Sequence, residues 1–300
     1  MRELIVGTRG SKLALMQTNK IIERLRKAGV NHPIQIKEIE TRGDRTLNLP
    51  LSKLAGDAFL QEIETQMIVQ SIDFAVHSLK DVPLQMPHGL MIASIPERED
   101  IRDAYLAKNH VKLNDLPTGS VIGTSSLRRS AQILAKRPDL KVKWIRGPID
   151  SRIEQLNQGH FDAIILAVAG IKRLGLGLDL ITEYLPVDTF MPAIGQGALA
   201  IECRTEDREL RKILRLINDE SIELVVHTER LFLKQFEDRE KEAIAGYATI
   251  EAGEIILHGA RLTADGKTVM NQKAKGKDSK KLAESVANQL KKQSVAKLVY

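Results

Sequence analysis

The chain has 300 residues, of which 43% are hydrophobic and 28% are charged, and this composition excludes a disordered or low-complexity protein. Its formal net charge of +6 favours anionic partners such as phosphates or carboxylates, whereas an aromatic content of only 4% argues against nucleic-acid binding by base stacking. The single cysteine, Cys203, excludes an intramolecular disulfide and a cysteine-based zinc site, and we expect no metal.

No segment has the character of a membrane anchor or a secretory signal. The first residues, MRELIVGTRGSKLAL, contain no long apolar stretch, and runs of about 18 uninterrupted apolar residues are absent throughout. We therefore expect a cytoplasmic protein without a membrane partner.

Strand-like and helix-like patterns alternate in the first third of the chain. Short apolar runs with β-branched residues predict strands, and apolar residues at helical spacing predict helices. Ser11 is placed to cap the first helix, which carries Ile21 and Leu25 on its apolar side. The predicted strands cover residues 4–8, 34–40, 73–77 and 90–95, and a second helix covers residues 59–70.

The alternation resumes after a charged break at residues 96–100. We predict strands at residues 120–124, 142–145 and 162–169. One helix follows at residues 126–136, and another ends near Gly159. Strands that alternate with helices favour α/β units with largely parallel sheets.

The last third of the chain changes in style. Thr205 is placed to cap a helix, and a further helix is predicted over residues 219–236. A hairpin follows, with Asp265 and Gly266 as a two-residue turn, before a final helix around Val286. These patterns predict a small α+β domain after two α/β domains.

Four loops that follow predicted strands are rich in groups that bind anions. Unpaired N–H groups and the positive end of the helix dipole lie at a helix N-terminus, so hydroxyls and arginines there suit carboxylate or phosphate ligands. In open α/β sheets the loops after the strands form the ligand crevice. We therefore predict an anion-binding site built from residues 7–11, 77–83, 123–130 and 146–152.

Asp81 is a single carboxylate among these cationic loops, and two roles for it are open. It can form a structural ion pair with Lys80 or an arginine, or it can stabilise a cationic intermediate or handle a proton. His77, at a predicted strand end, is expected to be a core or hydrogen-bonded histidine.

In their order along the chain, the loops and their flanking segments resemble those of the porphobilinogen deaminase family, also called hydroxymethylbilane synthases. The similar segments cover most of residues 3–235. They are GTRGSKLALMQ, ETRGD, HSLKDVP, ERED with RDAYL, GTSSLRRSAQILAKRPDLKV, RGPIDSR, DAIILAVAGIKRLGL, PAIGQGALAIECR and TERLFL.

The resemblance implies an α/β fold with two domains like the halves of periplasmic binding proteins, plus a small C-terminal α+β domain. Because the chain of such proteins crosses back, the expected first domain combines residues 1–96 with 197–215. The second domain is expected at residues 101–192 and the third at residues 219–300. Members of the family are expected to be monomers.

The resemblance also implies a transferase of tetrapyrrole, porphyrin and heme biosynthesis, which joins porphobilinogen units head to tail and releases ammonia each time to give hydroxymethylbilane. Porphobilinogen and its linear oligomers carry many carboxylates, for which arginines are suitable receptors. Asp81 would be the catalytic carboxylate that stabilises the cationic pyrrole species. The implied binding residues are Arg9, Ser11, Lys80, Thr124, Ser126, Arg128, Arg129, Arg146, Arg152, Arg173 and Gln196.

The sequence departs from the family pattern around one feature. Family members attach a dipyrromethane primer to a cysteine through a thioether, and that position falls here on Glu240, whose carboxylate cannot make a thioether. Cys203 matches a different family position. A family loop with a pattern like GGKGLF is here LAGDAF at residues 54–59, without the lysine, and Pro148 replaces the asparagine of RGN. We therefore expect no covalently bound dipyrromethane cofactor.

Two interpretations remain open. In the first, the protein is a porphobilinogen-condensing transferase that uses a primer not covalently held or makes a related oligopyrrole. In the second, it is a non-catalytic relative that binds porphobilinogen, a linear tetrapyrrole or another polycarboxylate. Asp81 and the arginines favour the first interpretation, and Glu240 with the altered loop favours the second.

Overall fold

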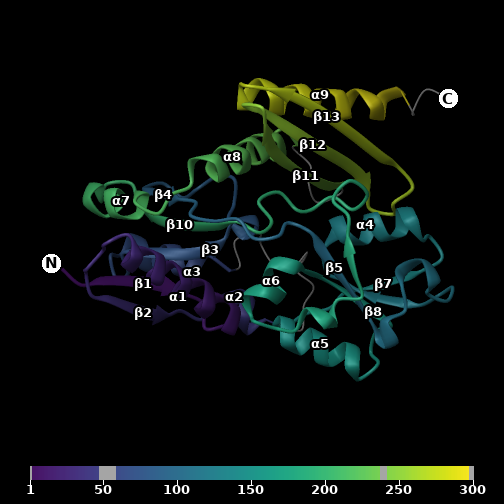
Figure 1. Cartoon of the computed structure of the whole chain (residues 1–300), viewed down its shortest axis with the longest axis horizontal. Coiled ribbons are helices and arrows are strands. Elements are labelled where there is room, and N and C mark those ends of the chain that lie inside the picture. Colours follow the sequence, from purple (N-terminus) through teal and green to yellow (C-terminus); the bar gives the residue numbers. More distant parts are fainter. Residues whose placement is uncertain (1, 47–58, 237–241, 297–300) are drawn as a thin grey trace. The chain divides into compact units, whose positions relative to one another are not determined.

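The computed structural model of the chain describes residues 2–46, 59–236 and 242–296 (Figure 1). Contacts between Cα atoms divide the chain into two compact units. Unit 1 comprises Met1–Glu99, Arg173–Gly175 and Gly197–Glu223. Unit 2 comprises Asp100–Lys172, Leu176–Gln196 and Leu224–Tyr300.

Unit 1 contains a five-stranded sheet in the order β2-β1-β3-β10-β4. β1 pairs in parallel with both β2 and β3, whereas β10 lies antiparallel between β3 and β4. The late strand β10 therefore completes a sheet that the first part of the chain begins. The strands are β1 (Leu4–Thr8), β2 (Ile34–Glu38), β3 (Phe74–Ser78), β4 (Leu90–Ser94) and β10 (Leu199–Arg204).

Helices cover both faces of this sheet. Alternate residues of a strand point to opposite faces, so Phe74 of β3 packs with Ile21 of α1, while Ala75 packs with Ile63 and Met67 of α3. Both faces of the sheet are thus buried, so the candidate functional side chains lie in the loops at the strand ends. The helices are α1 (Lys12–Lys27), α2 (Arg42–Arg45), α3 (Gln61–Ile68), η2 (Leu79–Asp81) and α7 (Arg208–Arg215).

Unit 2 contains a second five-stranded sheet in the order β7-β6-β8-β5-β9. β6 pairs in parallel with β7 and β8, and β5 lies antiparallel between β8 and β9, so the pattern of directions equals that of unit 1. The strands are β5 (Asp103–Ala107), β6 (Val121–Gly123), β7 (Lys141–Lys143), β8 (Ala163–Ala167) and β9 (Glu183–Leu185). The helices are η3 (Lys108–His110), η4 (Leu113–Asp115), α4 (Leu127–Lys136), α5 (Ile149–Asn157), α6 (Val168–Arg173) and η5 (Leu178–Leu180).

A third sheet is antiparallel, in the order β11-β12-β13. On one face, Phe232 and Val286 lie so close over Gly259 that a β-carbon there would have no room. On the other face, Ala260 packs against Ala131 of α4. Figure 1 shows α9 lying along this sheet. The elements are α8 (Glu220–Lys234), β11 (Glu242–Glu251), β12 (Glu254–Thr263), β13 (Val269–Gly276) and α9 (Ser279–Ala296).

The predicted α/β class with a separate C-terminal sheet and helix is confirmed. The three domain boundaries stay a prediction. No helix in the described ranges combines the length and the apolar character that spanning a membrane requires.

Three local predictions were wrong. Asp207, not Thr205, caps α7, because its carboxylate accepts the N–H of Leu210 at 3.1 Å. The predicted strand at residues 162–169 ends at Ala167, and α6 begins at the next residue, Val168. The turn at Gly266 is longer than two residues, since the N–H of Thr263 bonds to the carbonyl of Thr268.

Candidate functional site

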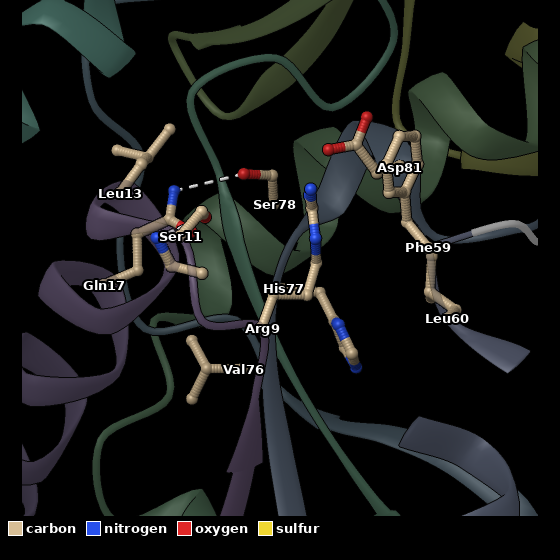
Figure 2. Close-up of a pocket in the computed structure, with 11 residues that line it drawn as sticks. Arg9, Ser11, Leu13, Gln17, Phe59, Leu60, Val76, His77, Ser78 and Asp81 are labelled. Carbon is tan, nitrogen blue, oxygen red and sulfur yellow. Dashed lines mark hydrogen bonds between the residues drawn. The ribbon is translucent and has the colours of Figure 1, made fainter. Parts of the chain in front are cut away.

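Unit 1 contains a pocket at the ends of β1 and β3 (Figure 2). Its walls come from the loop after β1, the first turns of α1, the end of β3 and the 3-10 turn η2. Three predicted site residues, Arg9, Ser11 and Asp81, meet there. The other lining residues are Leu13, Ala14, Gln17, Phe59, Leu60, Val76, His77 and Ser78.

The N-terminus of α1 forms one wall of this pocket. Ser11 caps the helix by accepting the N–H of Ala14 at 3.3 Å, and the first turn contains no acidic residue. The helix itself therefore supplies no acidic side chain to offset the positive end of its dipole. Gln17 donates to the hydroxyl of Ser78 at 3.1 Å, which ties α1 to the end of β3 (Figure 2). The wall suits a negatively charged group.

Asp81 and its neighbour Lys80 lie on the turn that follows β3. Leu79 and Val82, which flank them, are both buried, and the N–H of Leu79 donates to the carbonyl of Ala198 at 3.0 Å. These two anchors hold the turn so that Lys80 and Asp81 are exposed. The turn thus places a carboxylate at the pocket wall without burying it.

Arg9 is held at the pocket by two contacts. Its guanidinium binds the carboxylate of Asp44 through Nε and Nη2, and it lies 4.3 Å from the centre of the Phe59 ring. Burial raises the pKa of Asp44, but hydrogen bonds from Arg9 and Thr41 outweigh burial and lower it overall.

His77 is buried and hydrogen-bonded, as predicted. Its Nε2 lies 2.9 Å from a carboxylate oxygen of Glu202, and both side chains are shielded from solvent. In Figure 2 the ring of His77 points away from Asp81. The contact of His77 with Glu202 therefore belongs to the core beneath the pocket.

The other predicted loops lie in unit 2, next to one another. Ser126 caps α4, and Thr124 accepts the N–H of Ser126 at 3.2 Å. The hydroxyl of Ser125 donates to the carbonyl of Ile145 at 2.6 Å, which joins the third and fourth loops. The sequence-predicted clustering of these two loops is therefore present within unit 2.

Arg128 and Arg129 share one buried carboxylate. Arg128 donates to Asp103 at 2.7 Å and to the carbonyl of Met191 at 2.6 Å, and Arg129 donates to Asp103 at 2.6 Å. Gln196, fully buried, donates to Asp103 at 3.0 Å. Two guanidinium groups around one carboxylate leave a surplus positive charge at the start of α4.

The buried cluster shifts the pKa values of its members. Burial raises the pKa of Asp103, but the charges and hydrogen bonds of Arg128 and Arg129 outweigh burial and hold that pKa well below its usual range. Burial lowers the pKa of Arg128, and Asp103 opposes this change. The two arginines therefore favour the ionised form of Asp103, and Asp103 in turn favours the protonated form of Arg128 against the effect of burial.

Arg146 and Arg152 flank the turn before α5. Arg146 is buried, and Arg152 donates through Nε to the carbonyl of Gly147 at 2.8 Å. Gly147 has φ of +105°, which favours glycine, and Pro148 is the N-cap of α5 but makes no side-chain cap. Trp144 precedes this turn and is 49% exposed.

Arg173 belongs to unit 1, unlike the predicted site residues of the third and fourth loops, which belong to unit 2. It donates to the carbonyl of Gly197 at 2.6 Å and to Glu97 at 3.3 Å, and Lys20 also donates to Glu97 at 2.9 Å. Burial lowers the pKa of Arg173, while Glu97 raises it. These contacts tie Arg173 to the segments through which the chain leaves and re-enters unit 1.

The structure thus places five predicted site residues in unit 1 and seven in unit 2. Glu240 and residues 54–58 of the altered loop lie outside the described residues. Sequence reasoning missed Gln17, Phe59, Asp44 and Asp103. A signal for Asp103 was present, because an acidic residue that opens a buried strand needs a buried partner. The unit 1 residues are Arg9, Ser11, Lys80, Asp81 and Arg173, and the unit 2 residues are Thr124, Ser126, Arg128, Arg129, Arg146, Arg152 and Gln196.

Metal binding has no support in the part of the chain that the structure describes, where no group of three or more histidine, cysteine or acidic side chains is placed to hold an ion.

Comparisons with known sequences identify the family of the chain. The family model described as "Porphobilinogen deaminase, dipyromethane cofactor binding domain" matches residues 4–212. The porphobilinogen deaminase of Oceanobacillus iheyensis is 49% identical over 100% of this chain and 97% of its own, and that of Geobacillus kaustophilus is 47% identical over the same shares. A putative methionine-binding lipoprotein from Bacillus subtilis has a TM-score of 0.44 and 10% identity, covering 73% of this chain and 92% of its own. The chain belongs to the porphobilinogen deaminase family.

Proposed function

We propose that the protein is a transferase of tetrapyrrole biosynthesis that condenses porphobilinogen units head to tail with release of ammonia, to give hydroxymethylbilane or a related oligopyrrole. The observation that carries this proposal is the pocket in which the exposed carboxylate of Asp81 meets Arg9 and the capped N-terminus of α1. Such a pocket offers one carboxylate for a cation and several groups for anions.

The chemistry requires both kinds of group. The aminomethyl carbon of one porphobilinogen loses ammonia and becomes a methylene-pyrrolenine cation. The free α-carbon of a second pyrrole attacks this carbon, a C–C bond forms, and the attacking ring then loses its α-proton. Asp81 would stabilise the cationic species on both sides of bond formation, because a fixed carboxylate interacts more strongly with the cation than with the neutral reactant.

The acetate and propionate groups of the substrate would bind to the cationic residues of the two units. Bidentate arginine is well matched to carboxylate, and helix N-termini add N–H donors. The surplus positive charge of the Arg128, Arg129 and Asp103 cluster supports this assignment for α4. The proposed binding residues are Arg9, Ser11, Lys80, Thr124, Ser126, Arg128, Arg129, Arg146, Arg152, Arg173 and Gln196.

A covalently anchored dipyrromethane does not fit the cysteine content of this chain. Cys203 is the single cysteine. It is 0% exposed in the core around β10, and burial raises its pKa to about 11. A buried thiol with a raised pKa is a poor nucleophile. We therefore propose that the first acceptor is a free pyrrole or oligopyrrole and that no thioether forms.

A second candidate is a relative that binds porphobilinogen or a linear oligopyrrole without turnover, and the lack of an accessible cysteine favours it. Incubation with porphobilinogen, following its loss and the release of ammonia, separates the two. The transferase predicts loss of porphobilinogen with one ammonia for each unit joined. Quenching of Trp144 fluorescence without any loss of porphobilinogen would instead support the binding protein, since Trp144 is the single tryptophan and lies beside Arg146 in sequence.

A further inference from the structure

The segment Thr41–Asp44, part of the ETRGD motif, lies at the pocket, and the proposed function gives it no role. Thr41 is the N-cap of the short helix α2, and Thr41 and Asp44 bond to each other in a capping box. The Asp44 carboxylate accepts the Thr41 hydroxyl at 2.7 Å and the Thr41 N–H at 3.3 Å. Thr41 is 0% exposed, so the position of the Asp44 carboxylate is set by a buried neighbour.

The same carboxylate holds Arg9. Nε of Arg9 donates to both oxygens of Asp44 at 3.1 Å, and Nη2 donates to one of them. An arginine that binds a carboxylate through two nitrogens is fixed in plane and direction. Asp44 engages Nε and Nη2, so the Nη1 side of the guanidinium is not needed for this ion pair.

The Phe59 ring fixes Arg9 from a second direction. The guanidinium carbon lies 4.3 Å from the ring centre, a distance suited to cation–π attraction. The Phe59 ring also packs against α2, since a β-carbon at Gly43 would lie only 2.2 Å from a ring carbon. Glycine at position 43 therefore lets the Phe59 ring approach, and Arg9 is held between the ring and Asp44.

Resting on the function proposed above, we infer that α2 is a positioning element: Asp44 and Gly43 hold Arg9 and the Phe59 ring at the pocket so that the Nη1 side of the guanidinium receives a carboxylate of the pyrrole substrate. An unrestrained arginine side chain loses rotational freedom about several bonds when it binds a ligand, whereas a side chain that is already held in place loses little. Asp44 acts through Arg9 and is a positioning residue.

The test compares Asp44→Asn with Glu62→Gln in the full chain. Glu62 is a matched control, because it accepts from Arg42 and Arg45 of the same helix and is comparably exposed at 28% against 24% for Asp44. Two quantities are measured. The first is the rate at which phenylglyoxal modifies Arg9, by peptide mass spectrometry. The second is the Kd of porphobilinogen and of its dimethyl ester, by calorimetry.

In the Asp44→Asn chain, Arg9 should react about tenfold faster and the Kd of porphobilinogen should rise about tenfold, while the Kd of the ester changes less than twofold. Glu62→Gln should leave all three quantities within about twofold of wild type. An equal rise in both Kd values would mean a merely structural role and overturn the inference.

An unchanged rate of Arg9 modification in Asp44→Asn would also overturn the inference, whatever the Kd values of the two ligands are. If the wild-type chain does not bind porphobilinogen, the proposed function fails, and the Arg9 reaction rates still decide whether α2 positions Arg9.

Discussion

At the scale of single residues, the predicted anion receptors divide into two kinds. Arg9, Ser11 and Asp81 line a pocket, where Arg9 pairs with the partly exposed Asp44, whereas Arg128 and Arg129 are buried with Asp103. The sequence placed Arg128 and Arg129 at a predicted helix N-terminus, and we expected an anionic ligand there. The sequence could not identify Asp103 as the partner of these arginines, because Asp103 lies on a strand about 25 residues earlier and adjacency in space depends on the sheet order.

Asp103→Asn should destabilise the protein at pH 7 by about 3–5 kcal/mol, because two buried guanidinium groups lose their counter-charge. Asp139→Asn, which removes a carboxylate paired with Arg137 nearer the surface, should lower the unfolding midpoint less. Urea unfolding of both variants measures this difference. Equal midpoints for the two variants would show that the buried cluster is not needed for stability.

Acid should lower the unfolding free energy of the wild-type protein through protonation of Asp103. The pKa of Asp103 is lowered by folding, so its stabilising effect is complete above the unfolded value of about 3.9 and is lost as the pH falls toward the folded value. Unfolding free energies between pH 5 and pH 2 should therefore fall more steeply for wild type than for Asp103→Asn. Parallel curves would contradict the assigned ion cluster.

Asp81 is exposed on its turn, so its loss should affect turnover rather than folding. Asp81→Asn should lower the rate of porphobilinogen consumption by about 10²–10⁴-fold with little change in the unfolding midpoint. Glu206→Gln, an exposed acidic residue outside the pocket, should retain the wild-type rate. A fully active Asp81→Asn enzyme would remove Asp81 from the mechanism.

At the scale of elements, the periodicity of apolar residues located the central helices and strands well, and the turns less well. The tight hairpin turn of the third sheet uses Ala252 and Gly253, both with positive φ, although the sequence pattern favoured Asp265 and Gly266. Gly266 has a different physical reason. Its Cα packs on the backbone of α4, and a β-carbon there would lie 2.5 Å from the carbonyl oxygen of Ala131. A contact of this kind depends on tertiary packing and is invisible in local sequence.

This difference can be measured with two glycine substitutions. Gly253→Ala adds only the strain of a positive φ, because no atom lies within 4 Å of the added carbon. Gly266→Ala adds the same strain and a backbone overlap, and should be less stable than Gly253→Ala by about 2 kcal/mol. Thermal unfolding of the two variants tests this, and equal melting temperatures would show that the turn does not pack on α4.

At the scale of the whole molecule, the two five-stranded sheets share one pattern of strand directions, although the chain shows no internal sequence repeat. In each sheet the antiparallel strand, β10 or β5, begins just after the chain passes from one unit to the other. Alternation of strands and helices predicted the α/β class. The return of β10 to the first sheet was expected from family resemblance alone, since apolar periodicity does not encode which strands pair.

The central claim is condensation of porphobilinogen without a covalent primer, and intact mass spectrometry of the denatured protein tests it most directly. The spectrum is recorded before and during incubation with porphobilinogen, while its loss is followed in the same sample. We predict that porphobilinogen is consumed while the protein keeps the mass of its 300 residues, about 33.5 kDa, throughout. A mass higher by a dipyrrole, or the absence of any consumption, would contradict the account.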